Sequence, residues 1–387
     1  MIHRLINISK SHSFFLFGPR GSGKSTLLEQ IFPPKERIVL DLLDFELANE
    51  LISHPNNLLH RLAPYAGKKP WVIIDEVQKA PQLLDLVHKL IKERRFKFAL
   101  TGSSARKLKR GAANLLAGRA FVYHLFPLTV MELQERFVLR DALQFGTLPE
   151  MLHFSDTADK IRFLKAYAET YLKEEIITEQ IVRNLPPFRR FLDVAAQMNT
   201  NVINYSNIAK DIHSDPKTVS GYYDILEDTL LGLRLPAYHT SIRKQQKKAA
   251  KFYLFDTGIA RTLAGQIDYD LAPRSFEYGQ LFEAFVINEL HRRLTYHGKQ
   301  FKLSYLRVNE DVEIDLIIER GRRPPTLIEI KSTDQVDARH AKGLLTLGAD
   351  FQSPVQYLIS NDPDQKQFSN VLACPWNDAI ERIVSDA

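Results

Sequence analysis

A glycine-rich stretch near the amino terminus has the residue types and spacing of a phosphate-binding loop. It matches the pattern G-x-x-x-x-G-K-[ST] at every position. Glycines let the backbone curl so that its N–H groups point at phosphate oxygens, Lys24 reaches the β- and γ-phosphates, and the Ser25 hydroxyl is a ligand for Mg²⁺. We therefore predict that this loop binds ATP with Mg²⁺. The predicted contact residues are Gly18, Pro19, Arg20, Gly21, Ser22, Gly23, Lys24, Ser25 and Thr26.

A pair of carboxylates supplies the second half of this chemistry. Asp75 and Glu76 follow the apolar run Trp71–Ile74, and Asp75 lies 50 positions after Ser25. An apolar strand delivers such residues to the carboxyl edge of a sheet, where open α/β sheets bind ligands. We predict that Asp75 joins Ser25 in holding Mg²⁺ and that Glu76 orients or deprotonates the attacking water. Taken alone, an Asp-Glu pair is also typical of a helix cap.

Two further segments complete a family resemblance. With Phe98–Ser104 and Leu115–Arg119, these motifs resemble the AAA+ ATPases of bacteria and archaea that carry a C-terminal domain of uncharacterised function, over nearly the whole chain. The resemblance implies that Thr101–Ser103 is sensor 1, with Ser103 at the γ-phosphate or the attacking water. It also implies that Arg119 is an arginine finger for a neighbouring subunit, and hence a homo-oligomer. A structural salt bridge or a contact within its own subunit is the alternative for Arg119.

The elements that must position these residues follow from the apolar pattern. A helix is expected at Lys24–Ile31 and another within Pro81–Arg94, because the apolar residues of the latter have helical spacing. Strands separated by helical segments predict a parallel sheet covered on both faces, which is an α/β fold. A strand before the glycine-rich loop and a helix after it distinguish that loop from a chance turn. The expected strands are Phe14–Phe17, Arg37–Leu42, Trp71–Ile74, Phe96–Thr101 and Ala120–Leu128.

The middle of the chain is predicted to be mainly helical and to resemble a winged helix. Candidate helices are Phe163–Ile177, Arg189–Met198, Tyr205–Ile212 and Lys217–Leu230, with a break at Pro186-Pro187 and wing strands at Leu233–Tyr238 and Lys251–Phe255. If the helix that begins at Lys217 is a recognition helix, its side chains at Lys217, Thr218, Ser220 and Tyr222 face a DNA groove, and the basic run Arg243–Lys251 meets phosphate. The alternative is a module that contacts protein or closes as a lid.

The last third of the chain holds a second set of charged residues. A long helix is expected at Phe276–Thr295, followed by strands at Leu303–Val308, Glu313–Ile318 and Thr326–Lys331. The acids Glu283, Asp315 and Glu329, with Lys331, resemble the core of PD-(D/E)XK nucleases, in which acids bind Mg²⁺ and the lysine helps to activate water. Glu329 and Lys331 are two positions apart, so they share one face of a strand. A nuclease-like fold that does not cleave is the alternative.

The length and composition of the chain are typical of a globular protein with several domains. The chain has 387 residues, 44% of them hydrophobic, a net charge of +6 and a single cysteine, Cys374. No signal peptide or membrane-spanning run is evident, so the expected location is cytoplasmic, with no membrane partner. Three modules are expected, at 1–135, 136–270 and 271–387. The leading hypothesis is an ATPase that controls a nucleic-acid-directed domain, with DNA as partner. The alternative is a nucleotide-gated switch that binds a protein.

Overall fold

The amino-terminal module is built on a five-stranded parallel sheet, as predicted. The computed structural model describes residues 2–104, 118–171, 185–239, 249–308 and 312–386. The strand order is β2-β3-β4-β1-β5, and every pairing in this sheet is parallel. The fifth strand ends four residues earlier than expected. The strands are β1 Ser13–Phe17, β2 Arg37–Asp41, β3 Trp71–Asp75, β4 Lys97–Gly102 and β5 Ala120–His124.

Helices cover both faces of this sheet. Successive side chains of β1 point to opposite faces, and each face packs against helices in an apolar core. Phe14 and Leu16 pack with the helix that follows the glycine-rich loop, while Phe15 and Phe17 pack with helices on the other face. The helix on the first face is α1 Lys24–Ile31, which begins and ends where the sequence predicted. The helices on the second face are α2 Phe45–Ser53, α3 Asn57–Leu62 and α4 Leu83–Lys92. Short 3-10 turns are η1 Pro34–Glu36, η2 Ala63–Tyr65 and η3 Val77–Lys79.

The middle module contains the three helices and the antiparallel hairpin expected of a winged helix. The hairpin strands are shorter than predicted, with β6 at Gly232–Leu235 and β7 at Lys251–Leu254. Pro186 and Pro187 lie in the first turn of α10, where proline is tolerated because that turn needs no amide donors. The first module ends with α6 Val130–Leu133, and η4 Gln134–Arg136 spans the boundary. The helices of the middle module are α7 Leu139–Phe145, α8 Thr157–Ala166, α10 Leu185–Gln197, α11 Tyr205–Asp211, α12 Pro216–Asp228 and α14 Thr257–Leu263. Its shorter turns are η5 Pro149–His153 and the π-turn η6 Tyr167–Tyr171.

One residue of the expected recognition face was placed wrongly. Tyr222 on α12 is only 7% exposed, and its ring packs edge-on against Phe188, so it belongs to the core of the module. On the same helix Lys217 is exposed and Ser220 is half-buried. The Thr218 hydroxyl donates to Asp215 at the start of the helix. Most of the basic run, residues 243–248, lies outside the described residues.

The carboxyl-terminal module is a mixed six-stranded sheet with a long helix on it. The sheet order is β12-β13-β11-β10-β9-β8, with β10 antiparallel to β9 and parallel to β11. The apolar pattern had predicted the first three strands and the long helix. Its strands are β8 Lys302–Arg307, β9 Glu313–Glu319, β10 Thr326–Lys331, β11 Val355–Ser360, β12 Lys366–Phe368 and β13 Val371–Pro375. Its helices are α15 Phe276–Tyr296, α16 Lys342–Gly348 and α17 Trp376–Ser385.

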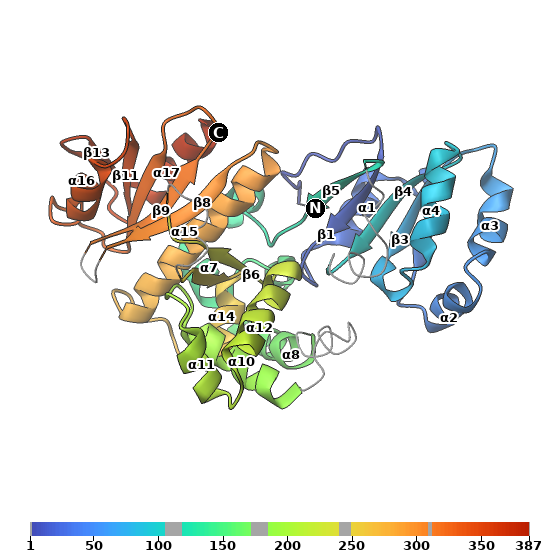
Figure 1. The fold of residues 1–387 in the computed structure, drawn as a ribbon, viewed down its shortest axis with the longest axis horizontal. Helices are drawn as coiled ribbons and strands as arrows, with labels where there is room; N and C mark the ends of the chain where they lie inside the picture. Colours follow the sequence, from blue (N-terminus) through green and yellow to red (C-terminus); the bar gives the residue numbers. More distant parts are fainter. Residues whose placement is uncertain (1, 105–117, 172–184, 240–248, 309–311, 387) are drawn as a thin grey trace.

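Helix α15 of the carboxyl-terminal module also forms hydrogen bonds with the other two modules (Figure 1). Its buried Arg292 donates to the carbonyl oxygens of Leu128 and Phe255, at 3.1 and 2.5 Å. Its Glu289 accepts a 3.0 Å bond from the Val130 amide, and the Tyr296 hydroxyl accepts one of 3.0 Å from the Phe126 amide. Within the described ranges, no helix is both long and apolar enough to cross a membrane.

Candidate nucleotide site

Two glycines give the glycine-rich loop a backbone conformation that most other residues adopt only with strain. Gly21 and Gly23 have φ values of 74° and 90°, in the left-handed region that favours glycine. Gly23 caps α1, so the free N–H groups of the first helical turn face the loop. The amino group of Lys24 donates to the carbonyl oxygens of Gly18 and Pro19, at 2.8 and 3.2 Å. The loop is thus curled around a buried ammonium group, as a phosphate cradle requires.

Ser25 and Asp75 meet at the carboxyl edge of the sheet. The Ser25 hydroxyl donates to Asp75 Oδ2 at 2.8 Å, although the two residues are 50 positions apart. Strand β4 lies between β1 and β3, and its Thr101 hydroxyl donates to the other oxygen of Asp75. Hydroxyl and carboxylate oxygens are the hard ligands that Mg²⁺ prefers, so these side chains fit the predicted ion.

Glu76 and Ser103 are joined by a residue that the sequence did not point out. The Gln78 amide donates to Glu76 Oε2 and also to Ser103 Oγ, the latter at 3.3 Å. Gln78 is 5% exposed, and Glu76 holds a left-handed φ of 54° just before η3. Strained backbone of this kind clusters at functional sites. The only signal for Gln78 was its position two residues after the carboxylate pair.

A cavity of about 560 Å³ opens over this edge. Eight of the predicted residues line it: Arg20, Gly21, Gly23, Lys24, Ser25, Thr26, Asp75 and Glu76. The other wall comes from the middle module and includes Arg136, Pro149 and His153. Sequence reasoning missed these residues because nothing local marks a wall contributed by a distant segment.

Two long-range contacts hold the loop from outside. Arg4 is 8% exposed, donates to the Ser22 carbonyl oxygen at 2.7 Å and pairs with Glu132 at 2.9 Å. The Tyr167 hydroxyl donates to the Arg20 carbonyl oxygen at 2.8 Å. The middle module therefore contacts the phosphate-binding loop itself.

Arg119 lies at the opposite edge of the sheet. It directly precedes β5, which runs parallel to β1, whereas the glycine-rich loop follows β1. A strand of five residues spans roughly 16 Å. Arg119 is therefore remote from the nucleotide cavity of its own chain, and it lines a different cavity at the opposite edge. Its role in a neighbouring subunit stays a prediction, as do the alternatives of a structural salt bridge or another contact within its own subunit.

The acids of the carboxyl-terminal module surround an ammonium group. Lys251 on β7 is 5% exposed, and its Nζ lies 3.2 Å from Glu283, 3.7 Å from Asp315 and in contact with Glu313. Tyr253 on the same strand donates to Glu283 at 2.7 Å. Sequence reasoning missed Lys251 as a member of this cluster because it lies on a strand of another module.

The remaining two residues of the predicted nuclease site form their own pair. Lys331 Nζ lies 2.5 Å from Glu329 Oε1, while Asp315 Oδ2 accepts a 2.8 Å bond from the Ile330 amide. Burial raises the pKa of Glu283 to about 7, against the opposing charge of Lys251. Burial and the Asp315 charge also raise the pKa of Glu329. Among the described residues, no group of three or more His, Cys, Asp or Glu side chains is arranged to hold a metal ion.

Comparison with protein families divides the chain into three matched segments. Residues 10–134 match the model described as an AAA domain. Residues 136–270 and 278–378 match two models described as domains of unknown function, DUF8612 and DUF4143.

Similar proteins occur in bacteria and an archaeon. The chain is 26% identical over 320 residues to the uncharacterized protein Rv2008c of Mycobacterium tuberculosis, covering 82% of this chain and 70% of that protein. It is 24% identical over 301 residues to an uncharacterized protein of Haemophilus influenzae, covering 71% and 73% of the two chains. It is 22% identical over 329 residues to the uncharacterized protein MJ1544 of Methanocaldococcus jannaschii, covering 78% and 71%.

Among solved structures, the Aeropyrum pernix ORC1 protein in complex with DNA matches with a TM-score of 0.28 and 13% identity, over 66% of this chain and 87% of that one. A signal transduction ATPase of the STAND type from Pyrococcus horikoshii matches with a TM-score of 0.23 and 12% identity, over 75% and 47%. Residues 10–134 thus match the AAA-domain model and also fold into a parallel sheet with an assembled phosphate-binding loop, so this part of the chain has the features of an ATP-binding AAA+ domain.

Proposed function

We propose that this protein binds ATP with Mg²⁺, hydrolyses it, and transmits the state of the nucleotide to its middle module. The proposal rests on two hydrogen-bonded groups of side chains at the sheet edge. In one, Ser25 and Thr101 donate to Asp75, and in the other, Gln78 donates to Glu76 and Ser103. Ser25, Asp75 and Glu76 line a cavity whose second wall belongs to the middle module. A change at the phosphates therefore reaches that module directly.

Each residue has a distinct task in this proposal. Lys24 leaves the loop carbonyls for the β- and γ-phosphates, and Ser25 and Asp75 hold Mg²⁺, which neutralises developing charge on the phosphates. Glu76 orients the attacking water and accepts its proton, while Gln78 holds Glu76 in position relative to Ser103. Productive placement of a nucleophile accounts for much of the catalysis in phosphoryl transfer.

Two variants test this assignment. Lys24→Ala removes the phosphate contact, so ATP affinity measured by calorimetry should fall at least tenfold. Glu76→Gln keeps the shape of the side chain without the base, so ATP should bind normally while turnover falls by roughly 100-fold or more. The exposed Glu46→Gln serves as the control, since Glu46 lies on α2 and does not line the cavity. Wild-type affinity and turnover in the Lys24 variant would contradict the site.

We further propose three modules at 1–135, 136–270 and 271–387, which the three matched segments support. The carboxyl-terminal module has two candidate roles, a nuclease-like domain under ATP control or a silent domain of the same fold that serves a switch. The position of Lys251 favours the silent form, because an ammonium among three carboxylates takes the place of a divalent cation.

Replacing the central lysine separates these two roles. Wild-type protein should bind no Mn²⁺ at this cluster and should leave plasmid DNA intact both with and without ATP. Lys251→Met should lose stability, because the buried acids lose their partner, and Mn²⁺ should then raise its melting temperature. The double variant with Asp315→Asn is the control and should respond less to Mn²⁺. Metal-dependent cleavage by the wild type that disappears in Asp315→Ala and Lys331→Ala would establish the nuclease instead.

A further inference from the structure

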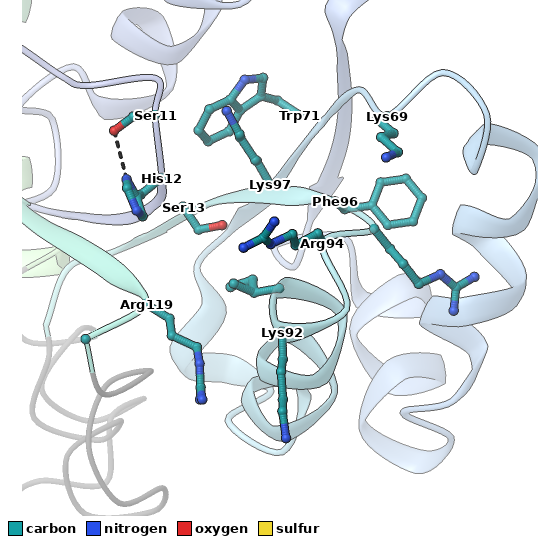
Figure 2. A pocket seen from close by; sticks show the side chains of 13 residues that line it. Ser11, His12, Ser13, Lys69, Trp71, Lys92, Arg94, Phe96, Lys97 and Arg119 are labelled. Carbon is teal, nitrogen blue, oxygen red and sulfur yellow. Dashed lines mark hydrogen bonds between the residues drawn. The ribbon is translucent and has the colours of Figure 1, made fainter.

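A second cavity lies at the other edge of the AAA-domain sheet and has no place in the nucleotide site. It measures about 680 Å³ and is bordered by Ser13, Trp71 and Lys97, the first residues of β1, β3 and β4. Figure 2 shows side chains from several separate segments around one hollow. The strands are parallel, so this cavity and the phosphate-binding loop are separated by the length of the sheet.

The lining of this cavity is strongly basic. It includes no carboxylate side chain and six basic ones: Lys69, Lys92, Arg94, Arg95, Lys97 and Arg119. Arg95 lies 3.7 Å from Glu93, and Lys97 donates to the Lys10 carbonyl oxygen at 2.8 Å. Within the described part of the chain, Lys69, Lys92 and Arg94 have no carboxylate at ion-pair distance. Unpaired cations around a hollow make a binding site for a polyanion.

A general role of surface cations in solubility or in capping a helix does not explain why these side chains gather around one cavity. Cations at the end of α4 complement its dipole, which explains Lys92 but not Lys69 or Lys97, since these lie on other segments. Lys69 and Arg94 also hold left-handed φ values of 46° and 54°. Non-glycine residues in that conformation are uncommon, and here two of them supply cations to one cavity.

An aromatic pair at the rim narrows the class of ligand. His12, which lines the cavity, lies against Phe121 with ring centroids 4.9 Å apart. Phe121 is 41% exposed although it is on a strand. A basic groove beside exposed aromatic rings is the combination that binds single-stranded nucleic acid, because the cations follow the phosphates while bases stack on the rings.

The geometry points to a binding site for a single strand of nucleic acid at this edge, which we call the basic-edge site: the six cations, His12 and Phe121. This site is independent of the proposed ATP hydrolysis, since no residue of it lines the nucleotide cavity. The rival occupant is the nucleotide of a second copy, approached by Arg119. A single nucleotide brings one base and only three phosphates, whereas the site gathers six cations from separate segments.

Fluorescence anisotropy with a labelled dT20 oligonucleotide tests the site. Lys92→Glu with Arg94→Glu should weaken binding at least tenfold and reduce the dependence of log affinity on log salt by about 1 to 2, the share of two phosphate contacts. Phe121→Ala should weaken binding by roughly 5- to 150-fold, the loss of one stacked base. The control Lys35→Glu with Lys342→Glu makes the same change in net charge at exposed residues elsewhere and should lose much less affinity.

Further measurements make the outcome specific to this edge. ATP turnover of the Lys92/Arg94 variant should stay at the wild-type level. Oligonucleotide carrying bromodeoxyuridine should cross-link to peptides that contain residues 10–13 or 118–122. Unchanged dT20 affinity in the variant, or cross-links confined to residues 205–251, would overturn the proposal. Loss of self-association in sedimentation with unchanged dT20 affinity would also overturn it and assign the edge to a second copy.

Discussion

Gln78 shows how one amide can organise a nucleotide site. Its side chain has one amide nitrogen, which donates both to Glu76 and to Ser103, the residue that follows β4. A β-carbon at Gly102 would lie 2.3 Å from Gln78 Oε1, so only glycine leaves room for Gln78 there. The carboxylate is thus held by a buried residue outside both sequence motifs, and we expect Gln78 to act as a positioning residue.

Removing this amide should affect turnover more than binding. Gln78→Leu keeps the apolar volume but frees Glu76, so kcat should fall by roughly 10- to 100-fold while ATP affinity changes little. Gln82→Leu is the matched control, because Gln82 is exposed and donates only to the Ile52 carbonyl oxygen. Equal losses in kcat for the two variants would show that Gln78 does not position the base.

Helix α15 carries ionisable groups that are buried where the modules meet. Glu289 is 1% exposed and accepts from the first residue of α6, while its Oε2 has no hydrogen-bond partner. Burial raises the pKa of Glu289 from 4.5 to about 7, although Arg292 opposes this change. The helix therefore contains a carboxyl group whose charge state changes close to neutral pH.

The sign of the resulting pH dependence follows from this shift. Below pH 4.5 Glu289 is protonated in both folded and unfolded chains, and between pH 4.5 and 7 only the unfolded chain releases its proton. Ionisation of Glu289 thus lowers the free energy of unfolding as pH rises, by up to about 3 kcal/mol at pH 8. Glu289→Gln has no charge to bury and keeps the acceptor for Val130.

Thermal melts at pH 5 and pH 8 check this expectation. The melting temperature of Glu289→Gln relative to wild type should be higher at pH 8 than at pH 5. Glu135→Gln, an exposed residue in η4, should show the same difference from wild type at both values. A constant difference for the Glu289 variant would mean that its carboxyl group ionises normally in the folded chain.

At the scale of the whole molecule, the nucleotide cavity is shared between two modules. The middle module contributes η5 to its wall and the Tyr167 hydroxyl to the loop carbonyl of Arg20. Arg292 of α15 in turn donates to Leu128 and to Thr147, in the segments on either side of α7. Arg4 donates both to the Ser22 carbonyl oxygen of the loop and to the Tyr296 hydroxyl of α15. Hydrogen bonds therefore connect the phosphate-binding loop to both other modules.

Hydrogen exchange should reveal this route. In the Glu76→Gln protein, which is expected to retain ATP, nucleotide should slow exchange in residues 149–153 and 163–171 as well as in the loop. Tyr167→Phe added to that protein should reduce the protection at 163–171 and leave that of the loop unchanged. Tyr205→Phe, on α11, is the control. Protection confined to the loop would show that the middle module does not sense the nucleotide.

Much of the local structure was determined by the sequence alone. The P-loop motif, its preceding strand and helix α1 depend on interactions among residues close in the chain: glycine dihedrals, the helix start and the apolar run. Apolar strands separated by helical segments likewise predicted a parallel sheet covered on both faces. Helix α15 and strands β8 to β10 were found for the same reason, since a long periodic pattern needs no distant partner to be recognised.

Only the tertiary structure decided which residues meet. Strand β4 enters between β1 and β3 and places Thr101 on Asp75, and β7 carries Lys251 into the acids of another module. Tyr222 carries a hydroxyl group that could contact DNA, yet the packing of the helices buries its ring against Phe188. Cations at Lys69 and Arg119 share one cavity because parallel strands begin at one edge. Such contacts join residues far apart in the chain, and no local pattern in the sequence records them.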